Sequence, residues 1–274
     1  MGSYSPAPPP EILPPATSQQ AQPSRRRSRW AVAPATYVLI AINCLWFLYM
    51  SARGVSFMDP TGEQLMHFGA DNAGSVLIYG EWYRIFTAMF VHAGILHLSV
   101  NMWCLWNLGL LAEPLMGSTG VFAVYLLTGT AGNLLSNLVN WYRFHAQGQF
   151  PACVGASGAV FGIAGALIIL LKSQRLPVPP SDLHKLRRSV IYFAAINLAI
   201  GFAISFTSGL TGIDIDNMAH LGGVSCGLLF AMPMVPRLGS PRSDFQSRLR
   251  LAIGIVVGIL ILFTFYIHKA VPVP

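Results

Sequence analysis

Two side chains with the chemistry for hydrolysis stand near the starts of long uncharged stretches of this chain. Ser157 lies in the run 155–158 (Gly-Ala-Ser-Gly), and His220 lies in the run 219–223 (Ala-His-Leu-Gly-Gly). A serine hydroxyl becomes a useful nucleophile when a base takes its proton, and a neutral imidazole is such a base. Ionisable groups inside a bilayer are costly and usually functional. The pair therefore predicts peptide-bond hydrolysis within a membrane.

Two further polar residues have the spacing of an oxyanion site. His97 and Asn101 are four residues apart, so on a helix both face the same side. An imidazole N–H and an amide N–H, together with the Ser157 backbone N–H at a helix start, can stabilise a developing oxyanion. The alternative is that these residues form structural hydrogen bonds between helices.

The sequence offers the histidine no obvious acidic partner. Asp214 and Asp216 precede its stretch in a loop and are expected to be solvated, so a Ser-His dyad is favoured over a triad. A buried structural role for His220 is the alternative. His92 and His97 are five apart and diverge on a helix, so we expect no metal, and dyad chemistry needs no cofactor. The cysteines lack metal-binding spacing and are expected to be small buried hydrophobes: Cys44, Cys104, Cys153 and Cys226.

The composition places these residues in a membrane protein. The 274 residues are 54% hydrophobic and 10% charged, whereas soluble domains average about 25% charged residues. A helix of about 20 apolar residues crosses the hydrocarbon. The uncharged stretches predict an all-α polytopic membrane protein with spans at about 33–50, 94–113, 119–140, 155–171, 189–207, 217–236 and 251–267.

The distribution of cations predicts the orientation. With the N-terminus in the cytoplasm and the C-terminus outside, thirteen of the 17 Lys and Arg residues lie inside. The other four are Arg53, Arg84, Arg143 and Lys269. The spans that carry His97, Ser157 and His220 then all run inward, so these groups share the outer half of the bilayer. We expect a multi-pass protein of the cell membrane.

The N-terminal segment and the net charge indicate no separate function. Residues 1–29 are rich in Pro, Ser, Ala and Gln and end in an arginine cluster, which predicts a disordered cytoplasmic tail facing anionic lipid. A twin-arginine export signal is disfavoured, because the apolar run that follows is too long and lacks a cleavage site. The net charge is +7, but no basic face appears, so no nucleic-acid partner is expected.

Small residues recur every four positions after both reactive residues. Gly158 and Gly162 form such a face in one span, and Gly223 and Gly227 form one in the other. Faces of this kind let two helix backbones approach closely, which would bring Ser157 towards His220. The alternative is a packing role alone.

Several motifs together resemble the rhomboid intramembrane serine proteases over about residues 35–267. The serine run is similar to the family's Gly-x-Ser-x motif, and residues 219–227 are similar to its Ala-His-x-x-Gly-x-x-x-Gly motif. His97 to Asn101 resembles His-x-x-x-Asn, and residues 109–113 resemble Gly-x-x-x-Glu. The supporting positions of the resemblance are His92, Gly155, Trp82 and Arg84.

The resemblance implies a six-helix core with one additional C-terminal helix, within a membrane domain at 30–270. It implies a Ser157–His220 dyad in a water-filled cavity open to the outside, and His97 and Asn101 at the oxyanion. It also implies that the loop before the second span lies in the outer leaflet. The implied substrates are single-span membrane proteins cut near the outer interface; the oligomeric state is left open.

Two rival functions are weaker. A catalytically inactive relative that binds membrane helices would typically lack the serine or the histidine, and this chain has both. A channel or transporter would use the same polar residues as a path, but the repeat symmetry usual in transporters is not evident in the sequence.

Overall fold

The computed structural model describes residues 33–147, 150–172, 179–211, 215–235 and 241–271, without the side chains of 144–147, 204–211 and 242. Within these ranges the chain is helical, and its one strand-like feature is an isolated bridge between Asp71 and Cys153. The predicted tail at 1–29 lies outside the described residues. The elements are α2 (Pro34–Ala52), α3 (Gly62–His67), α4 (Ala73–Leu77), α5 (Arg84–Thr87), the 3₁₀ helix η1 (Ala88–Phe90), α6 (Ile95–Gln147), α7 (Ser157–Leu170), α8 (Pro180–Thr211), α9 (Asn217–Ala231) and α10 (Arg242–Ala270).

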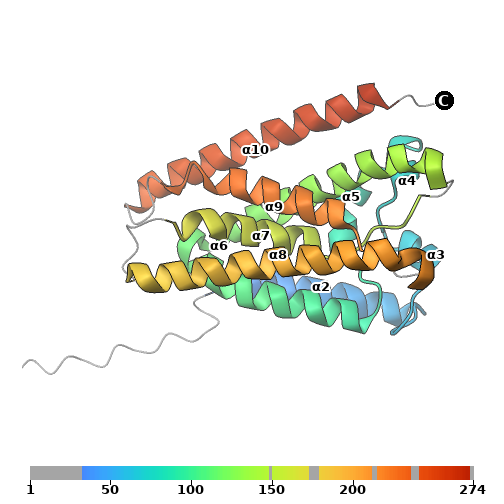
Figure 1. Cartoon of the computed structure of the whole chain (residues 1–274), viewed down its shortest axis with the longest axis horizontal. Helices are drawn as coiled ribbons and strands as arrows, with labels where there is room; N and C mark the ends of the chain where they lie inside the picture. The colour runs from blue at the N-terminus through green and yellow to red at the C-terminus, as the bar shows by residue number, and fades with distance from the viewer. Residues whose placement is uncertain (1–32, 148–149, 173–178, 212–214, 236–240, 272–274) are drawn as a thin grey trace, which may run out of the picture.

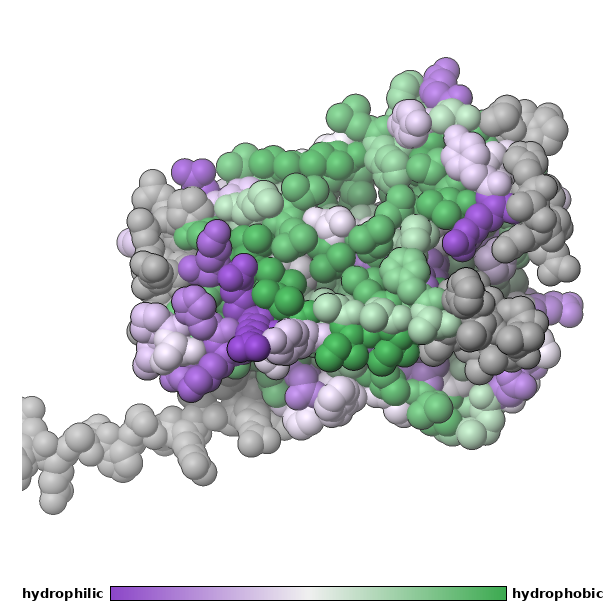
Figure 2. Space-filling view, viewed as in Figure 1, coloured by the Kyte–Doolittle hydropathy of each residue, from purple (hydrophilic) through white to green (hydrophobic). Residues whose placement is uncertain are grey.

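The long helices lie side by side in one bundle, with α10 along one edge (Figure 1). Among the described residues, four helices are long and apolar enough to cross a membrane: Pro34–Ala52, Ile95–Arg143, Pro180–Ala203 and Ser243–Ala270. The middle of the visible surface is largely hydrophobic, and hydrophilic residues gather mainly towards the ends of the bundle (Figure 2). These features fit the all-α polytopic membrane fold that the sequence predicts.

Helix α6 contains two of the predicted spans. Its helical geometry breaks at Gly117, where φ is 72°, just after Pro114. A left-handed φ is inexpensive only for glycine, so the chain can turn here and run back. The predicted spans at 94–113 and 119–140 therefore lie on either side of this turn.

Glu113 fixes the turn to the start of α2. Its carboxylate accepts hydrogen bonds from the Ala35 N–H (2.8 Å), the Thr36 N–H (2.9 Å), the Thr36 hydroxyl (2.7 Å) and the Ser118 hydroxyl (2.6 Å). The first backbone N–H groups of a helix have no partner within the helix. A buried glutamate from another helix supplies acceptors for two of these groups in α2.

The boundaries of the other spans differ from the prediction. Helices α8 and α10 begin at Pro180 and Arg242, earlier than the predicted 189 and 251, because charged residues extend them beyond the apolar stretch. Helices α7 and α9 have 14 and 15 residues, which gives lengths of about 21 to 23 Å against about 30 Å of hydrocarbon. The total of seven crossings therefore stays a prediction.

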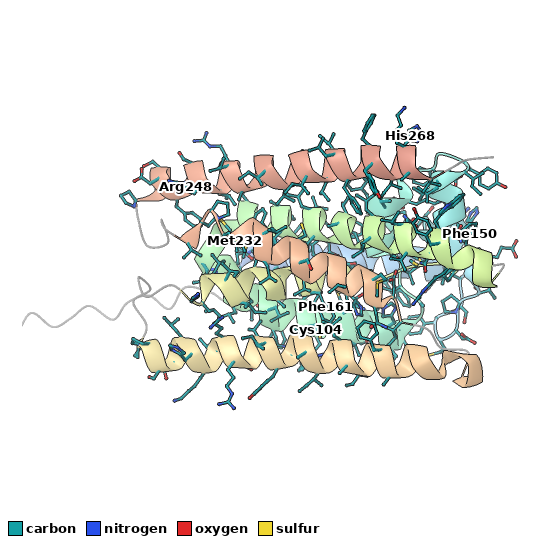
Figure 3. All side chains as sticks on the ribbon, turned by 45° about the horizontal axis from the view of Figure 1, so that its top comes forward. Cys104, Phe150, Phe161, Met232, Arg248 and His268 are labelled. Atoms are coloured by element: carbon teal, nitrogen blue, oxygen red, sulfur yellow. The ribbon has the colours of Figure 1, made fainter. Side chains whose placement is uncertain are left out.

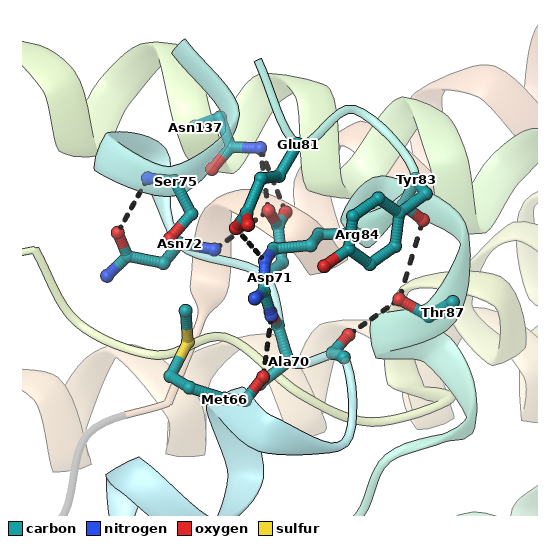
Figure 4. A network of polar contacts seen from close by, with 11 residues as sticks. Met66, Ala70, Asp71, Asn72, Ser75, Glu81, Tyr83, Arg84, Thr87 and Asn137 are labelled. Carbon is teal, nitrogen blue, oxygen red and sulfur yellow. Dashed lines mark hydrogen bonds and ion pairs between the residues drawn. The ribbon is translucent and has the colours of Figure 1, made fainter. Parts of the chain in front are cut away.

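The loop between α2 and α6 is folded rather than a simple turn. Arg84 is its centre: Nη1 donates to the carbonyls of Met66 (2.7 Å) and Ala70 (2.9 Å), and Nε bonds the Glu81 carboxylate at 2.6 Å (Figure 4). Arg84 as a whole is 9% exposed. Its fork of N–H donors joins the end of α3, the residues that follow it and the start of α5, which ties these parts of the loop to one another.

Candidate active site

The two helices that carry Ser157 and His220 are in backbone contact. A Cβ atom at Gly223 would collide with the Gly158 carbonyl, and one at Gly227 would collide with the Gly162 carbonyl. Residue numbers rise together along this contact, so α7 and α9 run in the same direction. A third close approach at Gly165, whose Cβ would meet the Val224 carbonyl, is absent from the sequence prediction.

The imidazole of His220 stacks on a side chain that lies one helical turn after Ser157. Its ring stacks on Phe161, with centroids 4.3 Å apart and planes at 16°. Phe161 is four residues after Ser157, so both project from the same face of α7. Figure 3 shows Phe161 inside the bundle. This aromatic contact sets the ring's position, and the sequence prediction did not include it.

Within the described residues, no hydrogen bond joins the Ser157 hydroxyl to His220. The His220 Nδ1 atom is buried and has no hydrogen-bond partner among them, so no carboxylate orients the ring as in a triad. Ser157 is half-buried at the first position of α7, where its backbone N–H has no acceptor within the helix. Hydrogen bonds of catalytic groups often tighten only when substrate is bound.

His97 and Asn101 meet the segment that leads into Ser157 at Gly155. A Cβ on Gly155 would lie 2.8 Å from His97 Nε2 and 3.8 Å from Asn101 Nδ2. Gly155 also has φ of 114°, so a side chain there is excluded both by conformation and by the imidazole. The contact places two potential N–H donors beside the residue two positions before the serine.

The hydrogen bonds of His97 set its tautomer. The Ala93 N–H donates to His97 Nδ1 at 3.3 Å, so Nδ1 is the acceptor and Nε2 carries the proton. Asn101 donates one amide hydrogen to the His97 carbonyl at 3.0 Å and keeps a second hydrogen. Both residues thus present an N–H group at Gly155.

His92 contacts the segment that leads into Ser157. Its Nδ1 lies 3.2 Å from the Phe90 carbonyl, and its Nε2 accepts from the Ala156 N–H at 3.4 Å. Burial, followed by the neighbouring His97, lowers the pKa of His92 to about 3. A neutral ring is required for this arrangement, because Nε2 must accept while Nδ1 donates.

Asp216 is expected to be solvated, but in the structure it is half-buried and hydrogen-bonded. Asp216 is the N-cap of α9: Oδ1 accepts from the Ala219 N–H at 2.9 Å, and Oδ2 accepts from the Ser136 hydroxyl at 2.5 Å. A capping aspartate is a common sequence signal at a helix start, but its bond to α6 depends on the fold. Asp214 lies outside the described residues.

Two residues of the predicted site, Trp82 and Arg84, lie in the loop between α2 and α6. Trp82 packs against the hydrophobic core, and Arg84 organises the loop described above. The loop reaches the serine segment through backbone bonds: Gly155 N–H donates to the Ala88 carbonyl at 2.9 Å, and Asp71 pairs with Cys153. Trp82 and Arg84 thus lie in a loop that is hydrogen-bonded to the serine segment, and their supporting role stays a prediction.

The described residues contain no group of three or more His, Cys, Asp or Glu side chains able to hold a metal. All four cysteines are unpaired: Cys104, Cys153 and Cys226 are buried, and Cys44 is half-buried. Burial raises the pKa of the Cys153 thiol well above its usual range, so the sulfur is a neutral packing group.

Comparison with known proteins identifies the family. The rhomboid domain family matches residues 79–237. The rhomboid protease GluP of Bacillus subtilis is 32% identical over 231 residues, which are 84% of this chain and 40% of GluP. The rhomboid protease AarA of Providencia stuartii is 27% identical over 221 residues, covering 77% of this chain and 76% of AarA.

Relatives named as inactive also occur. Inactive rhomboid protein 1 of Papio anubis is 31% identical over 195 residues, covering 68% of this chain and 20% of that protein. The chain spans less than half the length of GluP and of the inactive relative, and three quarters of AarA. Because the family match covers more than half of its residues, this chain belongs to the rhomboid family of membrane proteins.

Proposed function

We propose that this protein is an intramembrane serine endopeptidase that hydrolyses peptide bonds in or near the membrane-spanning segments of other proteins. The single observation that carries the proposal is the stacking of His220 on Phe161, one turn from Ser157 on the same face of α7. Relatives named as rhomboid proteases support the reaction class.

The proposed reaction uses a dyad. The Ser157 oxygen attacks the scissile carbonyl while His220 takes its proton, and His220 then gives that proton to the leaving amine as the C–N bond breaks. A water molecule, deprotonated by the same imidazole, releases the acyl group and restores the hydroxyl. No metal or cofactor takes part in this scheme.

The proposed oxyanion donors are the Nε2–H of His97, the second amide hydrogen of Asn101 and the Ser157 backbone N–H. Support comes from the position of the first two beside Gly155 and from the unfilled N–H at the start of α7. Losing one donor of this kind typically costs about 100- to 1,000-fold in kcat. His92 and Gly155 hold the segment in place.

The proposed substrates are single-span membrane proteins cut near the outer side of the bilayer, with membrane lipid around both partners. The proposed membrane domain is 30–270, with the N-terminus cytoplasmic and the C-terminus outside the cell membrane. The starts of α8 and α10, which carry cationic residues, lie at the same end of the bundle (Figure 1), and this supports the orientation.

The test is cleavage of a fluorescent single-span reporter by the purified full chain in detergent. Ser157→Ala and His220→Ala are each expected to lower kcat at least about 1,000-fold. Ser99→Ala, an exposed serine on α6, is the matched control and is expected to leave cleavage unchanged. Cleavage that persists in both dyad variants would contradict the proposal, as would a wild-type chain that binds the reporter without cutting it.

A further inference from the structure

Asp216 links the helix of the histidine to the segment of the serine. Its carboxylate accepts from Ala219 N–H in α9 and from Ser136 in α6. The Ser136 hydroxyl also lies 3.5 Å from Cys153 Sγ, four residues before Ser157. Asn140 donates to the Ser136 hydroxyl at 3.1 Å. The start of α9 is therefore fixed to α6 at the point where α6 also contacts the approach to the serine.

The position of His220 gives the charge of Asp216 a second role. His220 lies in the first turn of α9. Its backbone N–H donates to the backbone carbonyl of Asp216 at 3.2 Å. The N-terminus of a helix carries a partial positive charge, which disfavours a protonated histidine nearby. Proton transfer from Ser157 requires that protonated form. A carboxylate at the N-cap offsets the unfavourable field of the helix end.

Asp216 lies at the edge of a cavity, near a cation and other ionisable groups. The side chain is half-buried and borders a cavity of about 80 Å³ that Arg143 also lines. The neighbouring ionisable groups on the other side are Asp71 and the neutral Cys153 thiol. The ionisable group of α6 that interacts electrostatically with His220 is His97. Asp216 is thus the one carboxylate among the described residues placed at the start of the histidine helix.

We infer that Asp216 is a positioning residue of the proposed dyad: its side chain fixes the start of α9 against α6, and its negative charge stabilises the imidazolium that His220 forms during catalysis. This inference rests on the proposed function. The carboxylate does not touch the reacting atoms, and the step it assists is the transfer of one proton from Ser157 Oγ to His220.

The test compares three variants of the full chain with the single-span reporter from pH 5 to pH 9. Asp216→Asn keeps a capping oxygen but loses the charge. We expect kcat to fall about 5- to 10-fold, KM to stay unchanged, and the acidic limb of kcat/KM to move about half to one pH unit lower. Ser136→Ala loses the hydrogen bond to Asp216 but keeps the Asp216 carboxylate. We therefore expect kcat to fall a few-fold and the acidic limb to stay at the same pH.

Asp182→Asn is the matched control, because it removes an exposed carboxylate from the start of α8. It is expected to change neither kcat nor the acidic limb of the kcat/KM profile. An Asp216→Asn enzyme with the wild-type kcat and acidic limb would overturn the inference. So would an equal shift in Asp182→Asn.

A second measurement separates this inference from the proposed function. In the Ser157→Ala background, which is expected to be inactive, the titration of His220 is followed by NMR with and without Asp216→Asn. A lower His220 midpoint in the double variant supports the role of the charge even if the reporter is never cleaved. An unchanged midpoint overturns the inference without bearing on whether Ser157 is the nucleophile.

Discussion

The contact between α7 and α9 and the polar cluster at the start of α9 hold the same two catalytic candidates in opposite ways. The helix contact is made by glycines against carbonyl groups, at Gly223 with Gly158 and at Gly227 with Gly162. The polar cluster is made by side chains from four segments, centred on Asp71, Ser136 and Asp216. The first sets the separation of the helices, and the second sets the direction from which the chain enters them.

The two kinds of contact differ in how well they tolerate a substitution. A glycine contact has no room, so an added methyl group must push two backbones apart. A hydrogen-bonded cluster can lose one bond and keep the others, at a net cost of about 1 kcal/mol for each neutral bond. We therefore expect substitutions in the helix contact to abolish function and those in the polar cluster to adjust it.

Among substitutions that leave the dyad itself in place, the largest effect is expected for Gly223→Val. Its side chain would collide with the Gly158 carbonyl, so α7 and α9 must separate and Ser157 moves away from His220. We expect reporter cleavage to fall more than about 100-fold and the unfolding free energy in a detergent titration to fall by about 3 kcal/mol. Gly258→Val on α10, where a Cβ meets nothing within 4 Å, is the control; an equal loss in both would remove the special role of the helix contact.

A smaller effect is expected for a polar tie at the opposite end of the bundle. Glu113→Ala leaves two buried N–H groups at the start of α2 and the hydroxyls of Thr36 and Ser118 without their acceptor. We expect a loss of about 2 to 3 kcal/mol in unfolding free energy, with Glu113→Gln intermediate. Unchanged stability in Glu113→Ala would show that water replaces the carboxylate at this site.

The smallest effect concerns Asp71 in the polar cluster. Burial is the main cause that raises the pKa of Asp71 from 3.8 to about 7, with a smaller contribution from Asp216. Because the folded protein then binds this proton more tightly than the unfolded chain, Asp71 lowers stability as the pH rises from about 4 to about 7.

Asp71→Asn is expected to remove that slope. We expect a net gain of about 1 kcal/mol in unfolding free energy at pH 8, because the disturbed hydrogen bonds from the Asn72 N–H and the Asn137 amide offset most of the benefit of removing the buried charge. The buried Asn137 Oδ1, which has no hydrogen-bond partner among the described residues, can accept from the new amide once the Asn137 amide is flipped. The measurement is detergent unfolding at several pH values. If the unfolding free energy of Asp71→Asn still falls between pH 4 and pH 7, another group causes the pH dependence.

The same comparison shows why part of the fold could be predicted and part could not. The small residues of α7 and α9 recur at helical spacing, which is a local pattern. The span predicted at 33–50 corresponds closely to α2 (Pro34–Ala52). The bond between Ser136 and Asp216 joins residues 80 positions apart, and the stacking of Phe161 on His220 joins two helices. Such contacts depend on helix rotation, which a single sequence does not specify.

The helix lengths were harder to predict for a related reason. The uncharged stretches around Ser157 and His220 are long, but α7 and α9 have only 14 and 15 residues. Part of each stretch forms the segment that leads into or out of the helix. Hydropathy alone does not separate these irregular segments from helix, since both can be buried within the protein.

The most direct measurement is covalent labelling of the purified chain with a fluorophosphonate probe, which reacts with an activated serine whatever the natural substrate. We predict labelling at Ser157, identified by mass spectrometry of the modified peptide, and its loss in His220→Ala. Labelling that is absent from the wild type, falls on another serine, or persists without His220 would contradict the dyad.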